Sequence, residues 1–136
     1  MHCGDTLYFD PDLTGINSAV QVDPSASPNP HLWIVLTEPQ PPDHQVVIVN
    51  ITENKQRSDT TVVLHPGDHP FIRKESVVRY GDALIVDARL LDECVKGRKA
   101  RLGGPCSADL LNRIQVGVSA SIFTHKKIAA FCTGRF

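Results

Sequence analysis

The chain has 136 residues, 41% of them hydrophobic, and a formal net charge of −1. This length and apolar content predict a single domain over residues 1–136 with one core. No apolar run reaches the about 18 residues of a membrane-spanning helix, and the start MHCGDTLYFD lacks the pattern of a signal peptide. We therefore expect a cytoplasmic protein with no membrane partner.

Charge is divided unevenly along the chain. Residues 1–54 contain seven acidic residues and no Lys or Arg, whereas residues 55–136 contain all 14 basic residues and eight acidic ones. Such asymmetry is typical of a protein with one surface that faces a polyanion. The alternative is that the two halves interleave in one domain, so that their charges mix.

The cysteines favour a reduced protein without a metal centre. The chain has four, and no two of them form a C-x-x-C pair of the kind found in zinc sites. We expect reduced thiols, with Cys132 buried in the apolar run IAAFC.

The first half of the chain predicts strands. Apolar runs over residues 3–9, 31–37 and 45–52 are separated by turn residues, and the third run is apolar enough for burial on both faces. Residues 10–30 are rich in Asp, Pro, Ser and Asn, which predicts a long loop of the kind that forms lids and binding loops.

The second half predicts further strands and then helix. Residues 60–64, 76–78 and 84–87 are short strand candidates, and residues 88–95 predict one or two helical turns. A basic loop, KGRKARLGG, separates these turns from a helix that begins after Ser107 as its cap. Apolar residues at helical spacing extend this helix through Ile122 to a basic end at residues 125–127, and the tail IAAFC is either its extension or a last strand.

This order of elements predicts a mainly β (α+β) fold, namely a small curled barrel with a C-terminal helix. With these elements in this order, the chain resembles the MazF/PemK-like family of plasmid-maintenance and growth-inhibitor toxins. The resemblance rests on Gly4-Asp5 opening the first strand, HLWIVLTEP, VVIVNIT ending at Thr52, a later strand that leads into DARL, and a Gly-rich turn before SADLLNRI.

The resemblance implies an SH3-like β-barrel, usually a homodimer, that cleaves single-stranded RNA without a metal or other cofactor and is blocked by an antitoxin protein. It places His31 and Thr52 at the key polar positions. The family typically has an Arg-Pro pair where this chain has Pro30-His31. The segment GDHPFI, residues 67–72, resembles a divergent branch of the same superfamily.

Metal-free RNA cleavage needs a base for the 2′-hydroxyl proton, an acid for the leaving oxygen and a cation or donor for the phosphorane. Two histidines with a nearby cation can supply all three. We expect His31 and His69 as the acid–base pair and Thr52 as a catalytic donor. The remaining substrate-binding candidates are Arg57, Arg73, Lys74 and Ser76.

Three alternatives stay open. The same fold can serve as a non-catalytic module that binds nucleic acid or protein through its basic half. A metal-dependent hydrolase would use the cluster His65, Asp68 and His69, which offers nitrogen and oxygen ligands. Finally, Asp68 and His69 can simply hydrogen-bond within the turn before Pro70, and Trp33 can be either a stacking residue or part of the core.

Overall fold

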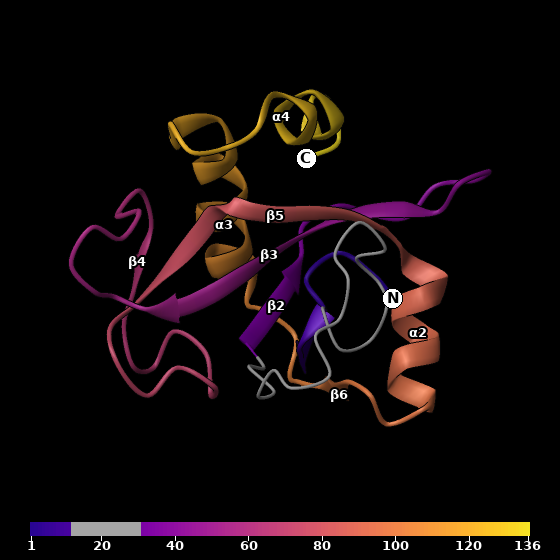
Figure 1. The fold of residues 1–136 in the computed structure, drawn as a ribbon, viewed down its shortest axis with the longest axis horizontal. Helices are drawn as coiled ribbons and strands as arrows, with labels where there is room; N and C mark the ends of the chain where they lie inside the picture. Colours follow the sequence, from indigo (N-terminus) through magenta and orange to yellow (C-terminus); the bar gives the residue numbers. More distant parts are fainter. Residues whose placement is uncertain (12–30) are drawn as a thin grey trace, which may run out of the picture.

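The computed structural model describes residues 1–11 and 31–136, which form a six-stranded antiparallel sheet and three helices (Figure 1). The expected loop over residues 10–30 therefore lies, from residue 12 onward, outside the described residues. The strands are β1 (Thr6–Phe9), β2 (His31–Val35), β3 (Gln45–Glu53), β4 (Val63–Leu64), β5 (Ser76–Asp87) and β6 (Arg101–Leu102). The helices are α2 (Ala88–Lys96), α3 (Ala108–Ala120) and α4 (Lys126–Cys132).

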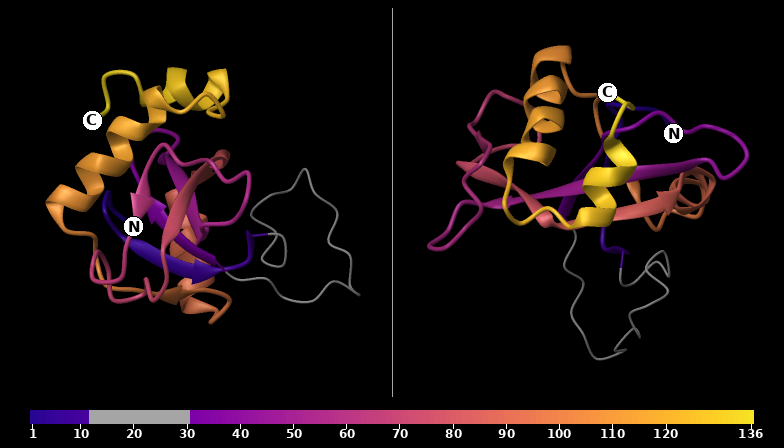
Figure 2. Two further views of the ribbon diagram at one scale, coloured as in Figure 1. Left: turned by 90° about the vertical axis from the view of Figure 1, so that its left-hand side faces the viewer. Right: turned by 90° about the horizontal axis from the view of Figure 1, so that it is seen from above.

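The strands follow one another across the sheet in the order β4-β5-β3-β2-β1-β6, and the sheet curls into a half-barrel beside α3 and α4 (Figure 2). The last strand, β6, pairs with β1, so that Tyr8 lies opposite Arg101. Strands from the acidic first half thus lie between strands from the basic second half. The two halves of the chain therefore interleave in one sheet, which agrees with the alternative in which their charges mix.

Each face of the sheet has its own apolar cluster, because successive side chains of a strand point to opposite faces. Val47 and Val49 of β3 belong to the α3-side core, which α3 and α4 complete with Ile114 and Ile128. Val46 and Ile48 belong to the α2-side core, which also contains Leu91 of α2. The prediction that β3 is buried on both faces is therefore confirmed.

One strand replaces the two short strands expected at residues 76–78 and 84–87. β5 runs from Ser76 to Asp87 and pairs with β3 along its length, with a register shift between Ile48 and Asn50. The shift accommodates Gly81-Asp82, which lie between the two expected strands. Tyr80 and Ala83 on either side of this bulge both enter the α3-side core, and their burial keeps the strand continuous.

The helix after Ser107 ends earlier than expected. α3 stops at Ala120, because Ser121 has extended backbone angles and its hydroxyl donates to Asp59 at 2.6 Å. Ile122 is 89% exposed and does not continue the apolar face. His125 does not end α3 but is the residue before the separate helix α4, so the tail IAAFC is helical and not a strand.

Other local expectations are confirmed. Ser107 caps α3 by accepting from the Leu110 N–H. Asp87, which the sequence analysis did not single out, caps α2 by accepting from the Arg89 N–H. None of the four cysteines forms a disulfide in the structure, and Cys132 is buried. Within residues 1–11 and 31–136, no helix combines the length and the apolar character needed to cross a bilayer.

Candidate functional site

His31 and Thr52 lie on neighbouring strands of the sheet. β2 and β3 pair with Leu32 opposite Ile51 and Trp33 opposite Asn50, and continuing this register places His31 opposite Thr52. Both residues line a hollow of about 300 Å³, which we name the first hollow. Its wall also contains Ser76, so three of the residues predicted from the sequence meet here.

Two charged residues that the sequence analysis did not single out also line the first hollow. They are Glu53, the last residue of β3, and Lys55, two residues beyond it. The Glu53 carboxylate lies 3.8 Å from the Lys74 ammonium, while the Ser76 hydroxyl donates to the Lys74 carbonyl at 2.8 Å. The residues that line the first hollow thus include a histidine, a glutamate, a lysine, a threonine, a serine and a tyrosine.

An aromatic pair forms another part of the same wall. The rings of Tyr8 and Phe71 lie 4.7 Å apart, tilted by 40°, and both line the first hollow. The Arg101 guanidinium lies 5.2 Å from the Tyr8 ring centre and 5.6 Å from that of Phe71. Aromatic faces beside a cation suit the stacking of nucleic-acid bases.

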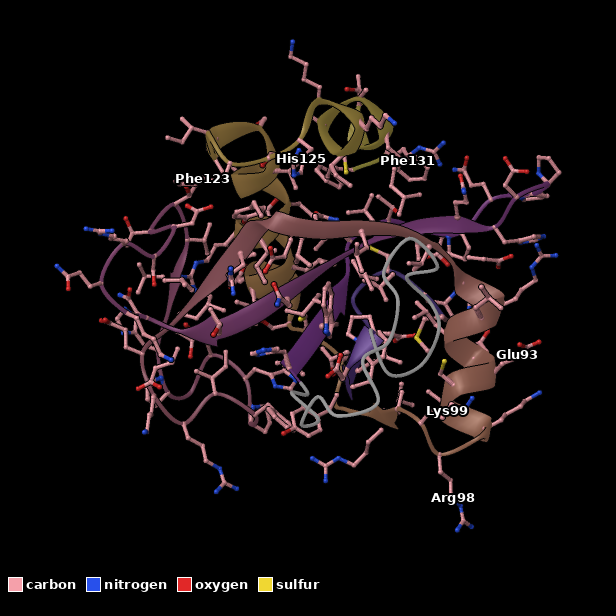
Figure 3. The ribbon with its side chains drawn as sticks, viewed as in Figure 1. Glu93, Arg98, Lys99, Phe123, His125 and Phe131 are labelled. Atoms are coloured by element: carbon pink, nitrogen blue, oxygen red, sulfur yellow. The ribbon has the colours of Figure 1, made fainter. Side chains whose placement is uncertain are left out.

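Arg101, from the basic loop KGRKARLGG, approaches the aromatic pair but does not itself line the first hollow. Arg98 and Lys99 are exposed beyond the end of α2 and point away from the body of the molecule (Figure 3). Phe71 belongs to the GDHPFI segment, so the sequence offered a signal that could have pointed to this residue as part of the site. The positions of Tyr8, Phe71 and Arg101 along the chain do not indicate that the three segments carrying them meet in the fold.

The structure does not bring His69 to His31. His69 is only 4% exposed, and its Nε2–H donates to the Gly104 carbonyl at 2.7 Å. Its Nδ1 accepts from the Phe71 N–H at 3.1 Å. Both ring nitrogens are therefore engaged by the backbone, and His69 joins the turn that carries Phe71 to the segment after β6. These contacts favour a structural role for His69, and the expected acid–base pair with His31 stays a prediction.

The predicted cations are spread over several places. Arg57 lines a second hollow of about 350 Å³, which shares Thr52, Glu53 and Lys55 with the first. Lys74 is exposed and pairs with Glu53 at the mouth of the first hollow. Arg73 is exposed and lines neither hollow.

The second hollow has an acidic residue that anchors three segments. The Asp59 carboxylate accepts hydrogen bonds from the hydroxyls of Ser121 and Thr61, both at 2.6 Å. Burial by itself raises the pKa of Asp59, but these bonds and those from the backbone N–H groups of Thr61 and Tyr80 outweigh it and hold the pKa below its ordinary value. Asp59 is thus a fixed carboxylate that ties the β3–β4 connection to β5 and to the end of α3.

The metal-binding alternative is not supported by the positions of its residues. The Asp68 carboxylate accepts from the His65 N–H at 2.8 Å and lies 3.5 Å from the Arg113 guanidinium, while His69 is turned inward. In the part of the chain that the structure describes, no three His, Cys, Asp or Glu residues are grouped to hold a metal ion.

Trp33 belongs to the core. It is buried in the α2-side core, with its ring 5.9 Å from that of Phe9. This position excludes Trp33 from a solvent-facing stacking surface.

Comparison with known proteins adds no assignment to this geometry. No protein-family model matches the chain, and no curated protein matches its sequence.

Proposed function

We propose that the chain is a metal-free endoribonuclease that cleaves single-stranded RNA in the first hollow, as a MazF/PemK-like toxin would. The observation that supports this proposal is the meeting of His31, Thr52 and Ser76 with Lys55 beside an aromatic pair. The same proposal includes an SH3-like barrel as the fold, a homodimer as the oligomeric state and an antitoxin protein as the inhibitor.

The residues of the first hollow suggest a division of chemical roles. The Glu53 carboxylate takes the proton of a 2′-hydroxyl, and the 2′-oxygen forms a bond to the adjacent phosphorus. The bond from phosphorus to the 5′-oxygen breaks, and protonated His31 gives its proton to that leaving oxygen. Lys55, with the hydroxyl of Thr52, stabilises the phosphorane, and Ser76, whose hydroxyl proton is donated to the Lys74 carbonyl, contacts the substrate as part of the wall. The products are a 2′,3′-cyclic phosphate and a 5′-hydroxyl.

This proposal predicts that cleavage depends on His31. An unstructured RNA is incubated with the protein in the presence of a chelator, and its products are sized and tested for the cyclic phosphate. His31→Gln removes the proton donor and is expected to lower the rate by about 10²–10⁴-fold. His65→Gln is the matched control, because His65 is exposed and lines neither hollow.

Binding must be measured separately from cleavage. A 2′-O-methyl RNA lacks the attacking hydroxyl, so its affinity reports binding alone, and His31→Gln is expected to leave this affinity within a few-fold of the parent. Cleavage that survives both His31→Gln and Glu53→Gln would show that the reaction does not occur in the first hollow.

A second candidate function is a non-catalytic module that binds single-stranded nucleic acid. The tilted pair of Tyr8 and Phe71 beside Arg101 favours it, because aromatic faces next to a cation support binding without chemistry. Binding of the 2′-O-methyl RNA without cleavage of ordinary RNA would select this candidate, and loss of affinity in Tyr8→Ala would locate it. A protein that neither binds nor cleaves RNA contradicts both candidates.

A further inference from the structure

The two hollows are neighbours that share one boundary. Thr52, Glu53 and Lys55, at the end of β3 and just after it, line both of them. Volumes of about 300 and 350 Å³ are each at the lower end of the range of ligand pockets, about 300–1,000 Å³. An extended ligand that fills the first hollow can therefore reach the second by crossing Lys55.

The second hollow has an aromatic residue on a rigid support. Phe123 lies on the connection between α3 and α4, and it is 53% exposed (Figure 3). Its N–H donates to the Ser121 hydroxyl at 3.1 Å, and that hydroxyl is itself bonded to Asp59. A Cβ built on Gly81 would lie 3.6 Å from the Phe123 Cβ, so the residue sits against the bulge of β5. An exposed ring that the backbone holds in place can receive a base.

The second hollow is lined by three basic residues, Lys55, Arg57 and Arg79, and three acidic residues, Glu53, Asp59 and Asp82. Arg79 is paired with Asp82 at 3.1 Å, and Asp59 is engaged by hydroxyl donors. Among the described residues, no acidic side chain forms an ion pair with Lys55 or Arg57. The cations left for a ligand thus lie at the boundary between the hollows and in the second hollow.

We propose that the second hollow is a nucleotide subsite for the same single strand. A nucleotide next to the cleaved bond stacks its base on Phe123, and its phosphate lies between Lys55 and Arg57. Stacking on a ring and contact with the phosphate make this subsite tolerant of base identity. The inference rests on the proposed function, because it extends the strand that occupies the first hollow.

The test is a series of 2′-O-methyl oligonucleotides of 2, 4 and 8 nucleotides, with affinities measured by fluorescence anisotropy. A dinucleotide occupies the first hollow alone, whereas longer strands reach both. We expect the affinity to rise about ten-fold from 2 to 8 nucleotides, a gain of the size that one stacked base provides. Phe123→Ala is expected to remove that gain and to leave dinucleotide binding unchanged.

Matched variants separate the ring and the cation from general surface effects. Ile122→Ala changes the neighbouring apolar residue, which lines neither hollow and should have no effect. Phe123→Leu keeps an apolar contact with Gly81 but lacks the ring, so it should behave as Phe123→Ala. Arg57→Gln is compared with Arg98→Gln, because both arginines are exposed and have left-handed backbone angles. Only the change at Arg57 should weaken the octamer.

Other results would overturn the inference in distinguishable ways. If RNA binds with an affinity that does not depend on length or on Phe123, the second hollow is not a subsite, and the proposed function survives. If Phe123→Ala changes the molar mass in light scattering while RNA affinity is unchanged, the ring belongs to a protein contact. If no oligonucleotide binds at all, the proposed function itself is wrong.

Discussion

At the scale of single residues, His31 and His69, which the sequence analysis expected to act together as an acid–base pair, have different surroundings. His31 is half-buried at the start of β2 and lines the first hollow. His69 is enclosed, and its two ring nitrogens are hydrogen-bonded to Gly104 and Phe71. The same imidazole is thus available for chemistry at one position and serves as a backbone clamp at the other.

The clamp predicts a loss of stability when His69 is removed. His69→Ala leaves a carbonyl and an N–H without their partner, and each such group costs about 1–3 kcal/mol when it stays buried. We expect a loss of about 2 kcal/mol or more in the free energy of unfolding, measured by urea denaturation. The exposed neighbour His65→Ala should change it by less than about 0.5 kcal/mol. Equal midpoints for the two variants would contradict the assigned role.

At the scale of elements, α3 approaches β5 closely at one glycine. Gly117 faces Tyr80, whose hydroxyl donates to the Ile114 carbonyl at 2.7 Å. A Cβ at Gly117 would overlap the Tyr80 hydroxyl and come within 2.8 Å of Val62 Cγ2. Burial, with a contribution from Asp59, raises the pKa of Tyr80 well above its ordinary value, so the phenol stays neutral. The hydroxyl and the glycine therefore set the distance between helix and strand.

Replacing this glycine is expected to destabilise the protein although alanine favours helices. Gly117→Ala gains about 1 kcal/mol from helix propensity, but the overlap should reverse the sign, with a net loss of about 1–3 kcal/mol. Ser119→Ala, an exposed change on the same helix, lacks the overlap and should be neutral or slightly stabilising. Thermal unfolding measures both variants.

A double-mutant cycle identifies the overlap as the cause. Tyr80→Phe removes the hydroxyl and should cost about 1 kcal/mol by itself. In the combined variant Tyr80→Phe with Gly117→Ala, the loss should be smaller than the sum of the two single losses. Additive losses would show that the Tyr80 hydroxyl is not what opposes a side chain at position 117, because the ring carbon Cζ, 2.5 Å from the added Cβ, is still present in Tyr80→Phe.

At the scale of the whole molecule, one sheet joins the two cores. β3 contributes Val47 to the α3-side core and Val46 to the α2-side core, and β5 contributes to both as well. If β3 or β5 detaches, apolar side chains of both cores become exposed to water. The pairing of β6 with β1 further links the two halves of the chain.

This arrangement predicts a single cooperative unfolding transition. Cys132 is buried in the α3-side core, whereas Cys94 and Trp33 are buried in the α2-side core. Pulsed thiol labelling of the two cysteines, read by mass spectrometry, and the fluorescence of Trp33 should all give the same urea midpoint. Separate midpoints for Cys94 and Cys132 would contradict the expectation of one domain over residues 1–136.

Part of the site could be predicted because it lies on adjacent strands. His31 and Thr52 end two consecutive apolar runs, and a short antiparallel connection places such ends side by side. Tyr8, Phe71 and Arg101 could not be joined in this way, because they come from β1, the turn after β4 and β6. The engagement of His69 depends on Gly104, which is 35 residues away in the chain.

By itself, the sequence determined the features that arise from near neighbours: the near-continuous apolar run that buries β3 on both faces, the cap at Ser107, and the apolar run of β2. Only the tertiary structure decided that residues 76–87 form one strand, that α3 ends at Ala120 and that Lys55 lies between two hollows. The physical reason is that propensity and capping act over a few residues. Burial, register and hydrogen-bond partners depend on segments that folding brings together from far along the chain.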